Sequence, residues 1–391
     1  MTSILFAWEL GGGRGHQTTL ARLAAPLLRE GCRVVAAIRP GVHAGDLLAA
    51  GIETLTAPVW PAAARTAADI RAMSSATMGD MLGEAGLADP VALGRLLDGW
   101  DAILQAVQPD LVVADYAPAA ALAARGRVPL LLTGNGFVAP PGDMPRFPPL
   151  HRAHPPRLAE PVLLETINTA LGARQRPLLD RLPRMFAADD ALVLILPIVD
   201  PYHVQRTRDV DGPLLDTLPV PRARESRRIF AYLSSAPERE GPLIAALTAF
   251  GPDLDLYAST IGSDELAPLA AAGARIFSRR PPSFEVLQTS RLVIHGGGSG
   301  LACEALLAGV PQLILSSHIE QELTGRAVAA HGCGAHFTER DPAAIRDAIA
   351  SGLADDAIAE HAATLGVEQR AFMATRDPLR AFVAACRRLA G

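Results

Sequence analysis

The chain has 391 residues, of which 49% are hydrophobic and 20% charged, and its formal net charge is −5. This length exceeds one ordinary core and predicts two domains, while the small negative charge argues against a surface for nucleic acid or an anionic membrane. All 36 basic residues are arginine, which excludes a catalytic lysine of the Schiff-base or P-loop kind.

The cysteines and the N-terminus indicate a reduced cytoplasmic protein. The four cysteines are dispersed and form no CxxC pair, so neither a zinc site nor a disulfide framework is indicated. The start of the chain, MTSILFAWELGGG, lacks a basic n-region and predicts a first strand instead of a signal peptide. No apolar run approaches the ~20 residues that a membrane span requires, although peripheral membrane contact is left open.

The N-terminal half alternates apolar strands with helical stretches, which indicates a parallel sheet. Its predicted strands are residues 4–9, 33–39, 111–114, 129–133 and 192–196. A glycine turn at 11–15 leads to a helix at 18–30, and the Ala-, Leu- and Met-rich stretch 62–107 is predicted to be helical. Residues 136–161 contain three Pro-Pro pairs and predict a long irregular loop.

A second α/β series follows a connection at 197–228 that is rich in proline and charge. Its predicted strands are residues 229–233, 255–258, 274–277, 292–294 and 312–315. An amphipathic helix at 377–389 closes the chain. The predicted divisions are an N-terminal domain at 1–205, a linker at 206–228, a C-terminal domain at 229–375 and a helical segment at 376–391 that packs back on the first domain.

The most informative segment is 295–321, HGGGSGLACEALLAGVPQLILSSHIEQ. An apolar strand leads into His295 and a glycine turn, and a helix follows from Leu301. Backbone N–H groups and a helix N-terminus in such a turn suit an anionic phosphate. Glycine turns also occur for conformational reasons alone, so the accompanying Glu304 and the pair Glu320–Gln321 carry the interpretation as a nucleotide-sugar site.

These motifs resemble the GT-B glycosyltransferases, and in particular the UDP-glycosyltransferase superfamily that includes bacterial macrolide and flavonoid glycosyltransferases, with some similarity to MurG. The resemblance covers both halves of the chain. Besides 295–321 it rests on GGGRGHQTTLARLAAPLLREGCRV near the N-terminus and on DVDGPL at 209–214, where the family often has Gly-Pro. It implies two Rossmann-like domains whose parallel sheets face a central cleft, and an inverting, metal-independent transfer from a UDP- or dTDP-sugar.

The resemblance places the donor site on the second domain. It implies that His295 and the amides after it reach the pyrophosphate, that Glu304 binds the ribose and that Glu320–Gln321 binds the transferred sugar. The structural alternatives are a tight turn with a solvated histidine, a solvent-facing glutamate and serines that only make turns. The expected donor-binding residues are Gly13, Ser234, Ser235, Arg280, His295, Gly297, Gly298, Ser299, Gly300, Glu304, Glu320 and Gln321.

The base of the nucleotide is left unsettled by one departure from the family. Many members carry Trp-x-Pro-Gln ahead of the donor motif, with the tryptophan stacked on uracil. This chain has Arg279-Arg280-Pro281-Pro282 there. An arginine can also stack on a base, so Arg280 remains a candidate donor residue.

His16 is the predicted general base. It closes the N-terminal glycine turn, and a near-neutral imidazole suits removal of a proton from an acceptor hydroxyl. Asp115, at the end of DLVVAD, occupies the strand-end position of the aspartate that orients this histidine in the resembling family. The competing interpretation is that His16 only caps a helix. Where the family often has a proline shortly after the histidine, this chain has Gln17-Thr18-Thr19.

The acceptor is expected to be a small apolar or amphipathic molecule. Its side would be lined by the proline-rich loop and by Trp60, Met73, Met78, Met81 and Phe137, although core packing explains the same residues equally well. Neither 209–211 nor 253–255, each an Asp-x-Asp, is placed for a cation, so no metal or cofactor is predicted.

Three other functions compete with this interpretation. An NADP-dependent Rossmann oxidoreductase would use GGGRG, whose spacing departs from GxGxxG, with Arg39 after the second strand. That alternative leaves the segment 295–321 unexplained. A non-hydrolysing sugar-nucleotide epimerase shares the GT-B architecture, and a non-catalytic sugar-nucleotide-binding protein is disfavoured by the pair His16 and Asp115.

Overall fold

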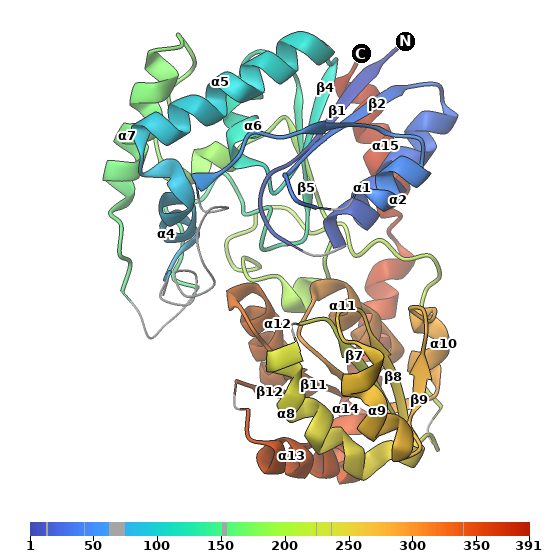
Figure 1. Cartoon of the computed structure of the whole chain (residues 1–391). Coiled ribbons are helices and arrows are strands. Elements are labelled where there is room, and N and C mark those ends of the chain that lie inside the picture. Colours follow the sequence, from blue (N-terminus) through green and yellow to red (C-terminus); the bar gives the residue numbers. More distant parts are fainter. Residues whose placement is uncertain are drawn as a thin grey trace. The chain divides into compact units, whose positions relative to one another are not determined.

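A computed structural model describes residues 1–12, 15–42, 44–61, 75–150, 155–223, 225–235, 237–338 and 340–391. The chain divides into two compact units (Figure 1). Unit 1 comprises Met1–Leu194, Tyr202–Leu214 and Asp377–Gly391, and unit 2 comprises Ile195–Pro201 and Leu215–Arg376. The chain therefore crosses between the units more than once.

Unit 1 is built on a six-stranded parallel sheet. Its strands are β1 (Ser3–Trp8), β2 (Arg33–Ile38), β3 (Glu53–Thr56), β4 (Leu111–Asp115), β5 (Leu130–Gly134) and β6 (Asp190–Val193). They lie in the order β3-β2-β1-β4-β5-β6. The central strands are buried on both faces, as the nearly continuous apolar runs of a parallel sheet require.

Helices cover this sheet. They are α1 (Gly15–Arg29), α2 (Gly45–Ala49), α4 (Met78–Leu82), the π-helix η2 (Gly83–Leu87), α5 (Pro90–Val107), α6 (Pro118–Ala124), α7 (Glu160–Gly172), the 3₁₀ turn η3 (Leu182–Phe186) and α15 (Pro378–Leu389). The last of these, red in Figure 1, packs against α1 at the other end of the chain. Phe382 meets Phe6 edge-on with ring centroids 6.1 Å apart, and Arg387 pairs with Glu30.

Unit 2 repeats the same strand order. Its strands are β7 (Arg228–Leu233), β8 (Leu254–Ala258), β9 (Arg275–Phe277), β10 (Ser290–His295), β11 (Gln312–Leu315) and β12 (Gly334–Phe337). They lie parallel in the order β12-β11-β10-β7-β8-β9. Both sheets thus have the doubly wound 3-2-1-4-5-6 arrangement of Rossmann folds.

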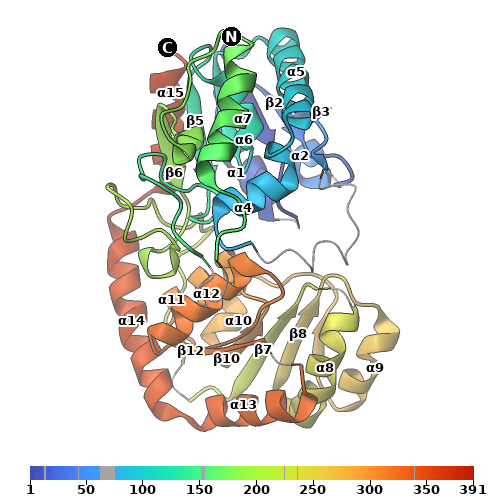
Figure 2. The same ribbon diagram turned by 90° about the vertical axis from the view of Figure 1, so that its left-hand side faces the viewer.

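The helices of unit 2 alternate with its strands (Figure 2). They are η4 (Pro197–Val199), α8 (Pro237–Leu247), η5 (Thr248–Asp253), α9 (Ser263–Ala271), α10 (Ser283–Gln288), α11 (Ser299–Ala308), α12 (Ile319–Ala330), α13 (Pro342–Ala354) and α14 (Asp356–Ala374). Among the described residues, none of these helices or those of unit 1 combines the length and apolar character that a membrane crossing needs.

The predicted parallel α/β fold is confirmed, with local differences. The edge strands β3 and β12 were not predicted, because they are short and only partly buried and so lack an apolar run. The strand predicted at 192–196 runs instead over Asp190–Val193. The stretch predicted as helical from 62 onward is described from residue 75, where α4, η2 and α5 form separate segments, and 62–74 lie outside the described residues.

The loop predicted at 136–161 contains no helix or strand in its described residues until α7 begins at Glu160. Its apolar side chains Phe137, Met144, Phe147 and Leu150 are nevertheless buried. The loop is therefore packed into unit 1. Of the residues expected near the acceptor, Trp60, Met78 and Phe137 are buried, Met81 is half-buried and Met73 lies outside the described residues.

The contact of α11 with α14 generates a stability prediction. A Cβ on Gly366 would lie 2.9 Å from Gly309 Cα and from Leu306 O, which is closer than packed atoms approach. Gly366→Ala is therefore expected to lower the free energy of unfolding by about 1–3 kcal/mol, as overpacking does. Gly352→Ala on α13 is the control, because its Cβ would make ordinary 3.6 Å contacts with Leu292, and it should gain up to about 1 kcal/mol of helix propensity. Denaturant unfolding of both variants tests this, and equal stabilisation would contradict it.

Candidate functional site

The strand order of each sheet reverses between two neighbouring strands. In unit 1 these are β1 and β4, and in unit 2 they are β7 and β10. In doubly wound folds the chain leaves two such strands toward opposite faces of the sheet, and ligands bind beyond the carboxyl ends of these strands. The predicted catalytic pair, His16 and Asp115, lies after β1 and at the end of β4 in unit 1. The glycine turn of segment 295–321 follows β10 in unit 2.

The structure brings His16 and Asp115 together. The ring nitrogen Nδ1 of His16 lies 2.8 Å from Oδ2 of Asp115. The carboxylate is 1% exposed and the imidazole 15% exposed. Asp115 is the last residue of β4 and the register partner of Trp8 on β1, whose indole stacks on the imidazole at 5.0 Å between ring centroids. The imidazole is therefore held in one orientation by an ion-pairing group and an aromatic face.

Gly11 lies against the other nitrogen of this imidazole. Its φ is +82°, and a Cβ placed on it would come within 2.5 Å of His16 Nε2. A side chain at this position would thus cover Nε2 as well as strain the backbone. Arg39 donates from its guanidinium to the carbonyl of Gly11 and so holds the turn. The guanidinium of Arg39 accordingly binds the protein backbone, whereas the oxidoreductase hypothesis would have it favour NADP.

The glycine turn of unit 2 is tightly built. Gly297 has φ +94°, and a Cβ there would lie 2.8 Å from the carbonyl oxygen of Gln321 and 2.9 Å from Ile314 Cγ2. Helix α11 then begins at Ser299, and its N-cap is Gly298, which has no side chain to cap the first turn. Gly298 and Gly300 are exposed. The N-terminus of α11 is therefore presented to solvent, in the manner of a helix that binds an anion.

His295 is buried and faces the interior of unit 2. Its Nε2 lies 2.9 Å from Oε1 of Gln312, and its Nδ1 accepts the backbone N–H of Gly297 at 3.1 Å. The side chain is buried, and burial lowers the pKa of the imidazole to about 4. Both ring nitrogens of the neutral imidazole thus form hydrogen bonds within the protein. We revise the expectation that the imidazole itself meets the pyrophosphate: His295 holds the turn whose amides are presented.

Gln312 was not predicted as part of this arrangement. It begins β11, accepts from His295 and donates from Nε2 to the carbonyl of Ala302 in α11 at 3.2 Å. It is fully buried. The available signal was a single amide at the head of the apolar run QLIL, since a buried polar side chain needs a partner.

Arg280, Glu304 and Tyr232 come together near the end of β7. The guanidinium of Arg280 lies 5.7 Å from the centroid of the Tyr232 ring and 3.7 Å from Oε2 of Glu304. Glu304 is in the second turn of α11, with its side chain 22% exposed. The predicted ribose ligand and the predicted base-stacking residue are therefore neighbours, as a nucleoside site requires.

Four of the remaining predicted donor residues lie in unit 2, on the loop after β7 and in the first turn of α12. Ser234 is exposed after β7, and Ser235 donates its backbone N–H to Glu240 on α8 at 2.9 Å. Oε1 of Gln321 accepts from the backbone N–H of Ser317 at 2.9 Å, so this side chain braces the loop before α12. Glu320 is in the first turn of α12. Gly13, the one donor residue predicted in the N-terminal half, lies outside the described residues.

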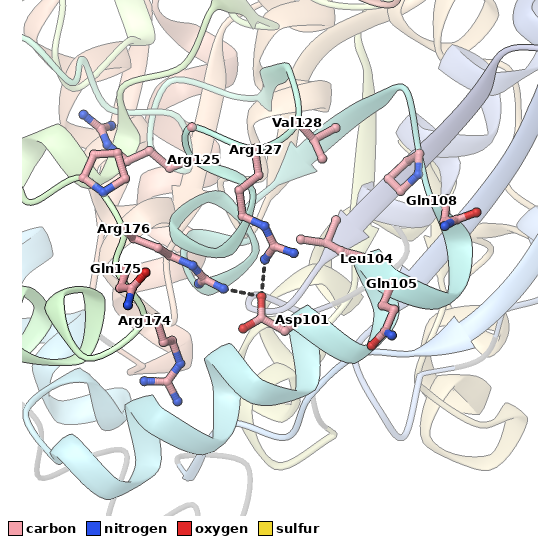
Figure 3. Close-up of a pocket in the computed structure, with 13 residues that line it drawn as sticks. Asp101, Leu104, Gln105, Gln108, Arg125, Arg127, Val128, Arg174, Gln175 and Arg176 are labelled. Atoms are coloured by element: carbon pink, nitrogen blue, oxygen red, sulfur yellow. Dashed lines mark hydrogen bonds and ion pairs between the residues drawn. The ribbon is translucent and has the colours of Figure 1, made fainter.

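A pocket of about 750 Å³ lies elsewhere in unit 1 (Figure 3). It is lined by residues that precede β4 and β5 and by residues 174–177 after α7, so it lies near the amino ends of these strands, whereas Asp115, the partner of His16, is at the carboxyl end of β4. Its guanidinium groups are engaged: Arg127 and Arg176 both bind Asp101, and Arg174 binds Asp98. We place no substrate there.

Within the described ranges, no three His, Cys, Asp or Glu side chains are grouped to hold a metal ion. The two Asp-x-Asp sequences have internal partners. Asp211 accepts the backbone N–H of Val193 at 2.8 Å, and Asp255 forms a two-bond ion pair with Arg228. All four cysteines are free thiols.

Comparison with known proteins agrees with this geometry. A family model described as erythromycin biosynthesis protein CIII-like, C-terminal domain, matches residues 270–378. The elloramycin glycosyltransferase of Streptomyces olivaceus is 27% identical over 261 residues, which are 62% of this chain and 60% of that protein. The chain thus matches less than two thirds of this relative's length.

Solved structures extend the likeness to the whole chain. The calicheamicin glycosyltransferase CalG4 superposes with a TM-score of 0.68 at 20% identity, covering 98% of this chain and 97% of the other. The spinosyn rhamnosyltransferase SpnG, complexed with thymidine diphosphate, gives 0.64 at 20% identity over 99% and 100%. This chain has the GT-B fold and resembles the UDP-glycosyltransferases. In a GT-B protein, the two sheets described above are the two Rossmann-like halves.

The buried His295 predicts a specific acid dependence of stability. Its pKa is lowered from 6.5 to about 4 in the folded protein, so the unfolded chain takes up a proton first as the pH falls. The stability it contributes is present above pH about 6.5 and is lost as the pH falls through about 4. His295→Gln is expected to lose about 1–3 kcal/mol at pH 7.5, and this gap should narrow toward pH 4.

Denaturant unfolding of the two proteins from pH 7.5 to 4 measures that gap. His331→Gln, at an exposed position, is the control and should follow the wild type at every pH. If the difference in free energy of unfolding between the wild type and His295→Gln stays constant with pH, the assignment of a neutral buried ring is contradicted.

Proposed function

We propose that this protein transfers a sugar from a nucleotide sugar to a hydroxyl of a small apolar or amphipathic acceptor, with inversion at the anomeric carbon and without a metal. The observation that carries the proposal is the 2.8 Å pair of His16 and Asp115 at the strand reversal of unit 1. It is supported by the presented helix N-terminus at the strand reversal of unit 2. The reaction needs both substrates at one place, so the base and the donor site must act on one donor–acceptor pair.

His16 is the proposed general base. A buried carboxylate that faces Nδ1 favours the tautomer with its proton there, so the lone pair lies on Nε2. That nitrogen can take the proton of an acceptor hydroxyl as the hydroxyl attacks the sugar. Asp115 stabilises the imidazolium that forms, as the carboxylate of a hydrolase triad does. A single displacement of this kind inverts the configuration of the sugar.

The donor site is proposed on unit 2. The backbone N–H groups at the start of α11 bind the diphosphate, whose negative charge grows as it leaves, and the helix dipole adds to this stabilisation. Glu304 binds the ribose and Arg280 lies against the base. Since these groups supply the charge stabilisation, no cation is required. The thymidine diphosphate complex of SpnG supports a nucleoside diphosphate of this class.

Gly11 provides a direct test of the base. Gly11→Ala is expected to lower kcat at least about 100-fold, because the methyl group covers Nε2, and to leave the affinity for dTDP unchanged. Gly31→Ala is a matched control: its φ of +81° imposes the same backbone strain, of about 1–2 kcal/mol, but nothing lies within 4 Å of its Cβ. Steady-state transfer assays compare the two variants. An equal loss of kcat in both would show that strain, and not access to Nε2, matters.

The donor site is tested by thermal shift with dTDP, UDP, GDP and NADPH, since a ligand of the folded state raises its melting temperature. A nucleoside diphosphate is expected to stabilise the protein. Glu304→Gln should weaken that binding about tenfold, as the loss of charge-assisted hydrogen bonds does. The exposed Glu360→Gln on α14 is the control. Stabilisation by NADPH alone would support the oxidoreductase instead.

Product analysis separates transfer from epimerisation. A glycosyltransferase is expected to form an inverted glycoside only when acceptor is present, and to keep its activity in EDTA. A donor sugar that is epimerised without acceptor would support the epimerase. Activity that vanishes in EDTA and returns with Mg²⁺ would contradict the metal-free mechanism.

A further inference from the structure

We propose that Glu9 is a positioning residue of the site: its carboxylate joins the segment after β1, which leads to His16 at the start of α1, to the first turn of α6, which follows Asp115 at the end of β4. This inference rests on the proposed function, in which these two residues act together. Glu9 directly follows β1 and precedes the glycine turn. It is 3% exposed and was not predicted as a site residue.

Three N–H donors surround the Glu9 carboxylate. Oε2 accepts from the backbone of Ala119 at 2.9 Å, and Oε1 accepts from the backbone of Ala120 at 3.1 Å. Oε1 also accepts from the indole Nε1 of Trp100 on α5. Ala119 and Ala120 belong to the first turn of α6, whose N-cap Ala117 offers no side-chain acceptor. Glu9 therefore caps a helix from a distant part of the sequence.

This cap ties together the two segments of the dyad. Helix α6 starts three residues after Asp115, so holding its first turn holds the end of β4. A second bond joins the same segments: the backbone N–H of Leu10 donates to the carbonyl of Tyr116 at 3.1 Å. Tyr116 has a φ of +46°, which is unusual for a residue with a side chain. The segments after β1 and β4 are thus joined at Glu9 and at Leu10.

The neighbours of His16 are part of the same arrangement. Trp8, which precedes Glu9, stacks on the imidazole and donates from its indole to the carbonyl of Leu10 at 2.6 Å. Successive residues of this short segment therefore orient the imidazole, hold α6 and hold Tyr116. A displacement of Glu9 is expected to reach His16 through Trp8 and Asp115 through α6.

The energetic cost of Glu9 also argues for a functional role. Burial raises the pKa of this carboxyl to about 8, although hydrogen bonding to Ala119, Trp100, Ala120 and Trp60 lowers it. A carboxylate in such a place destabilises the fold compared with an apolar side chain that packs equally well. Perturbed carboxyls of this kind concentrate at functional sites, where geometry outweighs stability.

Glu9→Gln is the variant that tests the proposal. It keeps the volume and one carbonyl oxygen, but it turns an amide group toward a donor, either Ala119 or Ala120. The first readout is the proton between His16 Nδ1 and Asp115, observed by NMR as a downfield imidazole signal that His16→Gln identifies. The second is kcat, which is expected to fall about 10–100-fold, as small misplacements of a base cause, while the affinity for dTDP stays within twofold.

Asp80→Asn is the matched control. Asp80 is also a fully buried carboxylate of unit 1, and it accepts backbone N–H groups of Ala76, Arg157 and Leu158. If the proposal is right, both variants lose stability, but only Glu9→Gln loses the downfield signal and the turnover. The proposal is overturned if Glu9→Gln keeps both, or if Asp80→Asn loses them equally.

Two further points keep the test decisive. If Glu9→Gln does not fold, Trp100→Phe replaces it, because it removes one donor and leaves Glu9 in place, and a smaller loss of the same readouts is expected. The NMR signal needs no catalysis. A wild-type protein that transfers no sugar would contradict the proposed function, while the signal in the variants would still decide the role of Glu9.

Discussion

The arrangement of the site depends on one constraint, the reversal of strand order in an all-parallel sheet. Each sheet has its first strand beside its fourth, so two successive βα units wind away from each other. The connections that follow these two strands leave toward opposite faces of the sheet. In unit 1 His16 comes after the first of these strands and Asp115 ends the other, although the two residues are 99 apart in sequence. In unit 2 the glycine turn and the start of α11 follow β10.

The second constraint is that buried polar groups must be hydrogen-bonded. His295 meets it through Gly297 and Gln312, and Glu9 meets it through α6 and Trp100. In both cases a buried polar side chain next to the proposed site binds backbone groups of the protein itself. This has a physical reason. Backbone amides bind an anion best when their positions are fixed beforehand, and buried hydrogen bonds fix them.

Much of this could be predicted from the sequence because it depends on local pattern. The apolar runs of β1, β4, β7 and β10 predicted both α/β halves, and the glycines after β1 and β10 predicted the two turns of the proposed site. The pair of His16 and Asp115 was predicted because both residues come at or just after the end of a predicted strand and match positions of the resembling family. The edge strands β3 and β12 could not be predicted, because a partly buried strand has no apolar run. The inward orientation of His295 could not be predicted, because its partner Gln312 is 17 residues away in the sequence.

The sequence by itself therefore determined where the chain turns, which residue types stand at those turns and that both halves are parallel α/β structures. These properties are carried by residues close together in the chain. Only the tertiary structure decided which polar side chains remain exposed and which bind other groups of the protein. That choice depends on burial and on partners from other strands, as Glu9 with Ala119, His295 with Gln312 and Arg280 with Glu304 show. Hydrogen-bond partners are assigned by proximity in space, which local patterns do not encode.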